Sequence, residues 1–281
     1  MNILITGATG FIGQGVVNLL TNNGHNVVAI VRKGRTLEPN KMVKFVECEI
    51  DTISEDIYLK FGKVDILIDL AWSKLDDYSS LHHFEIDLPM HYAFIKSLVR
   101  LGLKSVVVTG TCFEYGLQSG QLSEDMHVDP TTSYGYAKDS LRRQLVILQD
   151  NFNFNLTWLR LFYSYGGRKN GHDLYSQLEH AIVSRKTVFK MSKGDQVRDY
   201  ISYKELFGSI VKLSLINANL GIVNVCSGKP IAIKDLIGKW LIKNNWNIDL
   251  DLGFYQYSNC ESFCFWGDAQ KLKSILKSYL L

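Results

Sequence analysis

The 281-residue sequence contains no apolar run long enough to cross a membrane, and its first residues show no signal-peptide pattern. Its five cysteines, an odd number, lie far apart along the chain. That pattern favours reduced thiols over a disulfide framework. These absences together predict a cytoplasmic protein without a membrane partner.

The sequence also lacks a marked excess of charge of one sign. Its 31 basic and 28 acidic residues leave a net charge of only +3, scattered along the chain, which argues against nucleic acid as a partner. It contains no internal repeat and no low-complexity tract. Because 46% of the residues are hydrophobic and 21% are charged, the chain can bury a core and is not disordered.

What the sequence does contain is a glycine-rich loop close to its N-terminus. The apolar segment 2–5 is followed by Thr-Gly-Ala-Thr-Gly-Phe-Ile-Gly, residues 6–13, and then by apolar residues at helical spacing. In such a loop the first glycine allows a tight turn, the second lets a phosphate approach the backbone, and the third lets helix and strand pack closely. The helix N-terminus offers free N–H groups to a pyrophosphate. The sequence therefore predicts a dinucleotide site that includes Gly7, Gly10, Phe11, Ile12 and Gly13.

β-Branched apolar segments alternate with segments of helical periodicity along most of the chain. Such alternation predicts a parallel sheet covered by helices on both faces, and with the glycine loop first it predicts a doubly wound Rossmann α/β fold. We expect a dinucleotide-binding domain over 1–165 and a smaller, mainly substrate-binding α/β domain over 166–281, with 195–228 returning to the first. The expected strands are 2–5, 26–31, 43–46, 64–71, 104–109, 156–162, 187–191 and 222–226, and the expected helices are 11–20, 53–61, 87–100, 134–149, 173–185 and 231–244.

The second expected strand lacks an acidic residue at its end. In a NAD-binding domain an Asp or Glu at that place accepts hydrogen bonds from the ribose hydroxyls. Here the strand ends Val31-Arg32-Lys33, with Arg35 nearby, and these cations can pair with a 2′-phosphate. The pattern predicts NADP(H) in preference to NAD(H), with Arg32 and Lys33 as contacts. A solvated basic turn is the alternative.

A tyrosine and a lysine at helical spacing form the first part of a candidate catalytic site. Tyr134 and Lys138 lie four residues apart at the start of an expected helix, so they share one face of it. An ammonium group lowers the pKa of a nearby phenol toward working pH. Tyr134 could then exchange a proton with a substrate oxygen while a nicotinamide exchanges a hydride. A tyrosine and a lysine on a helix surface, without a catalytic role, are the alternative.

A hydroxyl group is expected at the carboxyl end of the fifth strand. Residues 109–116 read Thr-Gly-Thr-Cys-Phe-Glu-Tyr-Gly and follow that strand to the edge of the sheet where such folds bind ligands. A hydroxyl there can hydrogen-bond a substrate carbonyl oxygen and share a proton with Tyr134. We choose Thr111 for this role. Thr109, which we expect to be the last residue of the strand, is the alternative.

One cysteine pair has a spacing seen in metal sites. Cys260 and Cys264 lie four residues apart, but no further His or Cys pair lies near them in the sequence. Zinc needs three or four ligands, so we expect ordinary packing and no metal.

These motifs resemble the extended short-chain dehydrogenase/reductase family, which acts mainly on nucleotide sugars. The resemblance covers nearly the whole chain, through residues 6–13, 65–71, 111–116, 134–138, 159–166, 198–201 and 224–228. It implies a catalytic triad of Thr111, Tyr134 and Lys138, and a homodimer paired through helices 89–100 and 134–149. It also implies cofactor contacts from Glu49, Ile50, Leu70, Ala71, Trp72, Thr109, Tyr134 and Lys138, and substrate contacts from Trp72, Cys112, Tyr163 and Arg198.

Departures from the family pattern narrow the expected activity. Dehydratases of the family carry Asp-Glu directly after the catalytic hydroxyl residue, but here those places hold Cys112 and Phe113, and neither can protonate a leaving hydroxyl. Asp69 replaces the family's usual His, while Asp87 and Tyr163 each replace a usual Asn.

Segments 110–116 and 122–125 are most similar to one branch of the family. Its members reduce dTDP-4-dehydro-6-deoxyhexoses to dTDP-fucose or dTDP-6-deoxytalose for bacterial surface polysaccharide such as O-antigen. The resemblance implies NADPH-dependent reduction of the C4 ketone of a nucleotide-linked 4-dehydro-6-deoxyhexose. The alternatives are a nucleotide-sugar 4-epimerase with tightly bound NAD, and a non-catalytic NADP(H)-binding regulator, which would not need Thr111, Tyr134 and Lys138 together.

Overall fold

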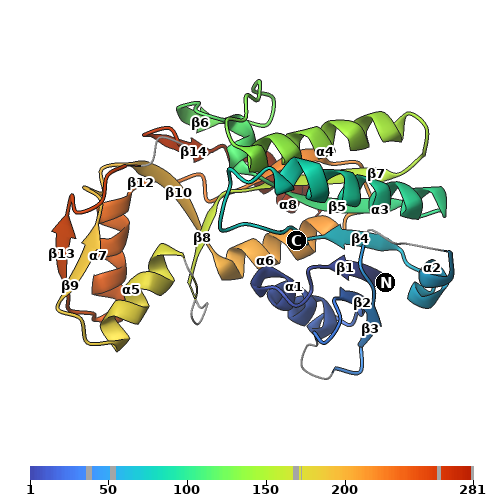
Figure 1. The fold of residues 1–281 in the computed structure, drawn as a ribbon, viewed down its shortest axis with the longest axis horizontal. Helices are drawn as coiled ribbons and strands as arrows, with labels where there is room; N and C mark the ends of the chain where they lie inside the picture. Colours follow the sequence, from blue (N-terminus) through green and yellow to red (C-terminus); the bar gives the residue numbers. More distant parts are fainter. Residues whose placement is uncertain (36–39, 51–54, 167–170, 172, 258–260, 280–281) are drawn as a thin grey trace.

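A seven-stranded parallel sheet forms the centre of the computed structural model, which describes residues 1–35, 40–50, 55–166, 171, 173–257 and 261–279. The strands run in the order β3-β2-β1-β4-β5-β7-β11, so the chain winds outward from β1 in both directions (Figure 1). The predicted doubly wound α/β fold is confirmed. The strands are β1 (Asn2–Thr6), β2 (Asn26–Val31), β3 (Val43–Glu47), β4 (Ile66–Asp69), β5 (Ser105–Thr111), β7 (Asn155–Leu161) and β11 (Gly221–Val225).

Helices cover both faces of this sheet, because its strands carry apolar side chains on both sides. Along β1, Ile3 and Ile5 pack with Leu206 on one face, whereas Leu4 packs with Leu141 on the other. The first face is covered by α1 (Phe11–Asn22) and α6 (Tyr203–Ser214), which contact each other, with α8 (Gln270–Ser278) beside β11. The second face is covered by α3 (Leu88–Arg100) and α4 (Ser133–Gln149), with α2 (Glu55–Phe61) near the edge.

The smaller part of the molecule, on the left of Figure 1, has its own apolar core around Leu178, Ile237 and Trp240. A three-stranded sheet joins β8 (Tyr163–Tyr165), β10 (Val197–Ser202) and β12 (Pro230–Ala232), and β9 (Val188–Met191) pairs with β13 (Asp249–Leu252). The helices of this smaller part are α5 (Leu174–Val183) and α7 (Ile233–Asn244). A separate pair of strands joins β6 (Gly120–Leu122) to β14 (Phe265–Gly267).

The domain division at residue 165 stays a prediction. Within 195–228, β10 pairs with β8 and β12, whereas α6 packs on α1 and β11 pairs in parallel with β7. Segment 195–228 is therefore divided: its strand β10 belongs to the three-stranded sheet, whereas α6 and β11 belong to the large sheet and the helices that cover it. Among the described residues, none of the helices has the length and apolar content that crossing a membrane would need.

Two expected strand ends are wrong, and both lie beside the candidate site. The segment 64–71 forms a strand only over Ile66–Asp69, because the next two amides, of Leu70 and Ala71, donate to Thr6 Oγ1 at 3.1 Å each. The fifth strand does not end at Thr109 but continues to Thr111. A π-helix over His83–Asp87, which periodicity did not predict, precedes α3.

Candidate active site

The glycine loop forms a tight cradle between β1 and α1. Gly7 has φ of +66°, and a Cβ there would lie 2.8 Å from the Ala71 backbone nitrogen. A Cβ on Gly13 would lie 2.1 Å from the Gly7 carbonyl oxygen, so the helix can approach the loop only without one. Gly10 is the N-cap residue of α1 and brings no side chain into the cradle. The loop thus fits the pyrophosphate of a dinucleotide.

The other predicted cofactor residues follow the carboxyl ends of neighbouring parallel strands. They therefore lie along one edge of the sheet. Arg32 and Lys33 follow β2 and are exposed, and an exposed Glu49 follows β3. The remaining ones are Ile50 after β3, Leu70, Ala71 and Trp72 after β4, and Thr109 near the end of β5, while Phe11 and Ile12 open α1.

Thr111 marks the point where β5 turns into a short 3₁₀ helix, η2 (Cys112–Tyr115). Its hydroxyl accepts a hydrogen bond from the Phe113 amide at 3.3 Å, while the Glu114 carboxylate accepts one from the Thr111 amide at 2.9 Å. This reciprocal capping box fixes the turn. It holds the Thr111 hydroxyl at the carboxyl edge of the sheet.

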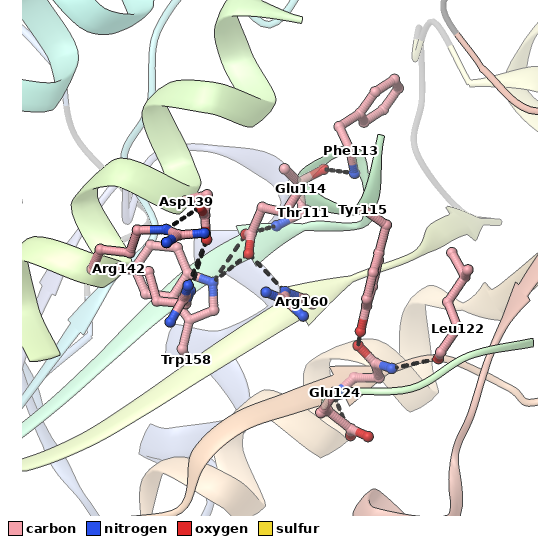
Figure 2. A network of polar contacts seen from close by, with 12 residues as sticks. Thr111, Phe113, Glu114, Tyr115, Leu122, Glu124, Asp139, Arg142, Trp158 and Arg160 are labelled. Atoms are coloured by element: carbon pink, nitrogen blue, oxygen red, sulfur yellow. Dashed lines mark hydrogen bonds and ion pairs between the residues drawn. The ribbon is translucent and has the colours of Figure 1, made fainter. Parts of the chain in front are cut away.

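A buried polar network supports this turn from below (Figure 2). Arg160 Nε donates to Glu114 Oε2 at 2.7 Å, and Trp158 Nε1 donates to Glu114 Oε1 at 2.9 Å. Gly110 leaves the space that these groups occupy, since a Cβ there would lie 2.2 Å from Trp158 Nε1. Glu114 is fully buried, and its two oxygens accept hydrogen bonds from Thr111, Trp158 and Arg160, so its carboxylate supports the turn.

Tyr134 stands at the start of α4 within a group of aromatic rings. Thr132 caps the helix by accepting a hydrogen bond from the Gly135 amide at 3.1 Å. The Tyr134 ring centroid lies 5.3 Å from that of Tyr78 and 6.2 Å from that of Trp72. The wall beside the phenol is therefore apolar and aromatic.

The expected lowering of the Tyr134 pKa is wrong for this structure. Burial raises the pKa of Tyr134 well above its ordinary value, and Tyr78 and Glu114 raise it further, against a hydrogen bond from the Thr111 hydroxyl. The phenol is therefore protonated at neutral pH.

Lys138 lies one turn further along α4 and is 2% exposed. Its ammonium group donates to the Thr109 carbonyl oxygen at 2.8 Å and lies 3.8 Å from the centre of the Trp72 ring. Burial lowers the pKa of Lys138 to about 8, although the charges of Asp69, Glu114 and Asp87 oppose that shift. The structure thus brings Thr111, Tyr134 and Lys138 to one place.

Comparison with known proteins shows the family of this chain. Residues 3–225 match the family described as the NAD dependent epimerase/dehydratase family. The chain belongs to that family. The resemblance to the extended short-chain dehydrogenase/reductases is thereby confirmed.

Two relatives and one solved structure match most of the chain. The dTDP-6-deoxy-L-talose 4-dehydrogenase (NAD(+)) of Aggregatibacter actinomycetemcomitans is 29% identical over 95% of this chain and 99% of its own. The GDP-6-deoxy-D-talose 4-dehydrogenase of the same organism is 24% identical over 81% of this chain and 75% of its own. A UDP-glucuronic acid 4-epimerase from Bacillus cereus, solved with UDP-glucuronic acid and NAD, has a TM-score of 0.81 at 22% identity, over 99% of this chain and 93% of its own.

Several buried polar residues of this family member were missed from the sequence as parts of the site. His91 Nδ1 lies 2.7 Å from Asp69 Oδ2, and both side chains are buried. The Ser73 hydroxyl donates to the Asp87 carboxylate, whose two oxygens lie 2.9 and 2.8 Å from it, and His83 accepts a hydrogen bond from the Trp72 indole. The available signal was that His91 follows Asp87 by one helical turn on the buried face of α3.

Of the predicted substrate residues, Cys112, Tyr163 and Arg198 lie near one another, whereas Trp72 lies beside Lys138. Arg198 is buried, and its Nε and one terminal nitrogen donate to Glu261 at 3.2 and 2.9 Å. The other terminal nitrogen donates to two backbone carbonyls, so in this structure a phosphate would have to displace Glu261. The Tyr163 ring lies 5.4 Å from that of Tyr200. Cys112 is buried, and burial raises the pKa of its thiol far above its ordinary value.

No metal site emerges from the part of the chain that the structure describes, where no three His, Cys, Asp or Glu side chains cluster suitably. Of the cysteine pair noted in the sequence, Cys264 is a half-buried free thiol, and Cys260 lies outside the described residues.

Proposed function

We propose that this protein is a nucleotide-sugar 4-ketoreductase. It reduces the C4 ketone of a dTDP-linked 4-dehydro-6-deoxyhexose with NADPH, in the synthesis of sugars for bacterial surface polysaccharide. The observation that carries the proposal is the meeting of three groups: the Thr111 hydroxyl hydrogen-bonds the Tyr134 phenol, and the Tyr134 ring and the Lys138 ammonium both lie against Trp72, at 6.2 and 3.8 Å from the centre of its ring. A ketone reduction needs a proton donor of this kind at one oxygen.

The surroundings of Tyr134 support a single redox step rather than dehydration. Dehydration needs a further acid and base near the reacting carbons, but Cys112 has a strongly raised pKa, Phe113 is apolar, and Glu114 is fully buried against Arg160. The rings of Tyr78 and Phe113 beside Tyr134 suit an apolar methyl group at C6 of a 6-deoxy sugar. The 4-dehydrogenase relative, matched over nearly its whole length, is named for oxidation of a dTDP-6-deoxyhexose at the same carbon.

Four residues have separate roles in the proposed reduction. The Thr111 hydroxyl orients the substrate carbonyl, and Tyr134 donates its proton to O4. Lys138 holds the ribose next to the nicotinamide and places a positive charge near the phenol, while Arg198, once released from Glu261, pairs with the diphosphate. When bound, the nicotinamide supplies the hydride that C4 gains. The ketone is thereby reduced to an alcohol, and Tyr134 regains a proton from solvent.

The preference for NADP(H) rests on the cations after β2. Arg32 and Lys33 are exposed at the carboxyl end of that strand, where the ribose 2′ position of a bound dinucleotide falls in this fold. The relative's name specifies NAD(+), so NAD(H) is the competing cofactor.

The first test is to follow NADPH and NADH oxidation with dTDP-4-dehydro-6-deoxyglucose and to identify the product sugar by NMR. We expect faster turnover with NADPH and a single C4 epimer as product. If neither cofactor is consumed although both bind, the reductase assignment is wrong.

The second candidate is a nucleotide-sugar 4-epimerase, favoured by the likeness in fold to the B. cereus 4-epimerase. An epimerase retains and recycles its NAD. Mass spectrometry of the denatured, purified protein separates the two, because retained NAD would favour the epimerase.

We also infer a homodimer paired through α3 and α4, which pack side by side (Figure 1). The α4 side chains of Val146 and Ile147 are exposed and would be covered by such pairing. Light scattering of the protein and of an Ile147→Glu variant tests it, since the variant should be monomeric.

A further inference from the structure

We propose that Asp69 and His91 form a positioning pair: together they hold Trp72 as the platform for the Lys138 ammonium and supply its buried counter-charge. The inference rests on the role of Lys138 proposed above. It goes beyond that role by assigning work to two residues that touch neither cofactor nor substrate.

The first step is the fixed position of Trp72. The His91 ring stacks on the Trp72 ring at 4.9 Å and 24°, and the Lys138 ammonium lies 3.8 Å from the centre of the same ring. The Trp72 indole N–H donates to His83 Nδ1 at 3.1 Å. The stacking of His91 and the hydrogen bond to His83 therefore set the plane of the ring on which the ammonium lies.

The second step is the anchoring of Asp69 to the glycine loop. Asp69 Oδ1 accepts from the Thr6 hydroxyl at 2.5 Å, and Asp69 Oδ2 lies 2.7 Å from His91 Nδ1. Thr6 directly precedes Gly7, and its hydroxyl also accepts the Leu70 and Ala71 amides. The pair thus connects the cradle for the dinucleotide to the platform for Lys138.

The third step is the state of the His91 ring. Because Nδ1 faces a carboxylate, it carries the hydrogen, and His91 Nε2 is buried without a hydrogen-bond partner in the structure described. A phenyl ring could pack against Trp72 without the free-energy cost of a buried, unsatisfied nitrogen, so packing alone does not explain a histidine here. His91 therefore combines two properties that are both used here, a flat ring against Trp72 and a donor to Asp69.

The fourth step is the balance of charge around Lys138. The acidic groups that face it are Asp69, Glu114 and Asp87, and the titratable side chains packed near them are His83, His91 and Tyr134. Burial raises the pKa of Asp69, but the contact with His91, the hydrogen bond from the Thr6 hydroxyl and the nearby Lys138 leave it below its ordinary value. His91 therefore keeps Asp69 ionised as a counter-charge for the ammonium.

The experiment measures NADPH affinity by calorimetry across pH, without any sugar, for the full-length protein and its variants. Wild-type affinity should fall as the pH rises through about 8, where Lys138 loses its proton. Asp69→Asn removes the counter-charge and should move this midpoint down by about one pH unit.

Two substitutions at His91 separate its properties. His91→Phe keeps a ring on Trp72 but removes the donor, so buried Asp69 takes up a proton and the midpoint falls as in Asp69→Asn. His91→Asn keeps a donor near the Nδ1 position and should restore the wild-type midpoint. If Asp69→Asn does not fold, the two His91 variants make the same comparison.

The matched control is Asp139→Asn, in the same helix as Lys138. It removes a buried carboxylate that pairs with Arg142 and Arg143 and not with Lys138 (Figure 2 shows Asp139 and Arg142). It should lower the melting temperature and leave the midpoint unchanged. Equal midpoints in all variants, or no pH dependence near 8 in the wild type, would overturn the proposal. Since no sugar is present, these results stay independent of whether the protein reduces a 4-ketosugar.

Discussion

Arg160 and Glu114 form an ion pair of 2.7 Å in which both side chains are almost completely buried. The other oxygen of Glu114 accepts the Thr111 amide at 2.9 Å. The pair therefore lies directly beneath the turn that presents the Thr111 hydroxyl. Its two charges stabilise the turn, and they are unavailable to a substrate.

Breaking this pair should be strongly destabilising. In Glu114→Gln the Arg160 guanidinium keeps its charge without a buried counter-charge, and removing one partner of a buried pair costs about 3 to 5 kcal/mol. Urea unfolding measures the change. The exposed pair of Arg143 with Asp139 is the control, since the Arg143 side chain is 56% exposed and Arg143→Ala should cost less than about 1 kcal/mol. Similar losses in both variants would contradict this account of Glu114.

Removing the Tyr134 hydroxyl should stop proton donation while leaving the fold intact. We expect Tyr134→Phe to lower kcat by about two to four orders of magnitude, the range for a lost acid–base group. Steady-state kinetics with the ketosugar measures this, and NADPH affinity should stay close to that of the wild type. Tyr136→Phe is the control, because Tyr136 is 56% exposed, and it should retain full activity. A Tyr134→Phe enzyme with near-normal turnover would remove Tyr134 from the mechanism.

Lys138 should be needed for turnover but should destabilise the folded protein. Its pKa is about 8 in the folded protein against 10.5 in the unfolded chain, so the unfolded state binds more protons in between and stability rises with pH over that interval. Below pH 8 Lys138 is charged in the folded protein, so the free energy of unfolding is lowered by the full cost of burying that ammonium group. In Lys138→Met the Asp69 carboxylate keeps its contacts with Thr6 and His91, so the substitution should raise the free energy of unfolding at neutral pH by about 1 to 3 kcal/mol.

The same substitution should weaken cofactor binding and abolish turnover. Unfolding curves and NADPH titration of one preparation measure both effects. A less stable Lys138→Met protein would show that the hydrogen bond to Thr109 and the contact with Trp72 outweigh the cost of burial.

Replacing the cations after β2 should change cofactor choice. Arg32→Ser removes a bidentate partner for a 2′-phosphate, so NADPH affinity should fall about tenfold or more. NADH, which lacks this phosphate, should bind almost as before. Titrations of both cofactors provide the measurement. An equal loss of affinity for NADPH and NADH would show that Arg32 does not distinguish the two cofactors.

Local patterns were enough to predict the sheet, because its strands are short apolar runs separated by helices and turns. The segments 26–31 and 134–149 were placed nearly as observed, as β2 and α4. Periodicity failed where tertiary contacts end or extend a strand. The Thr6 hydroxyl bonds the amides after Asp69 and stops β4 there, whereas pairing with β7 carries β5 on to Thr111.

The sequence alone determined the glycine loop, the Tyr134–Lys138 spacing and the family, since each depends on residue types at fixed short separations. Only the tertiary structure decided the charges at the site. Asp69 and His91 are 22 residues apart, and Arg198 and Glu261 are 63 apart, so no local pattern reveals that they meet. Burial, which the sequence does not state, raises the pKa of Tyr134 and lowers that of Lys138.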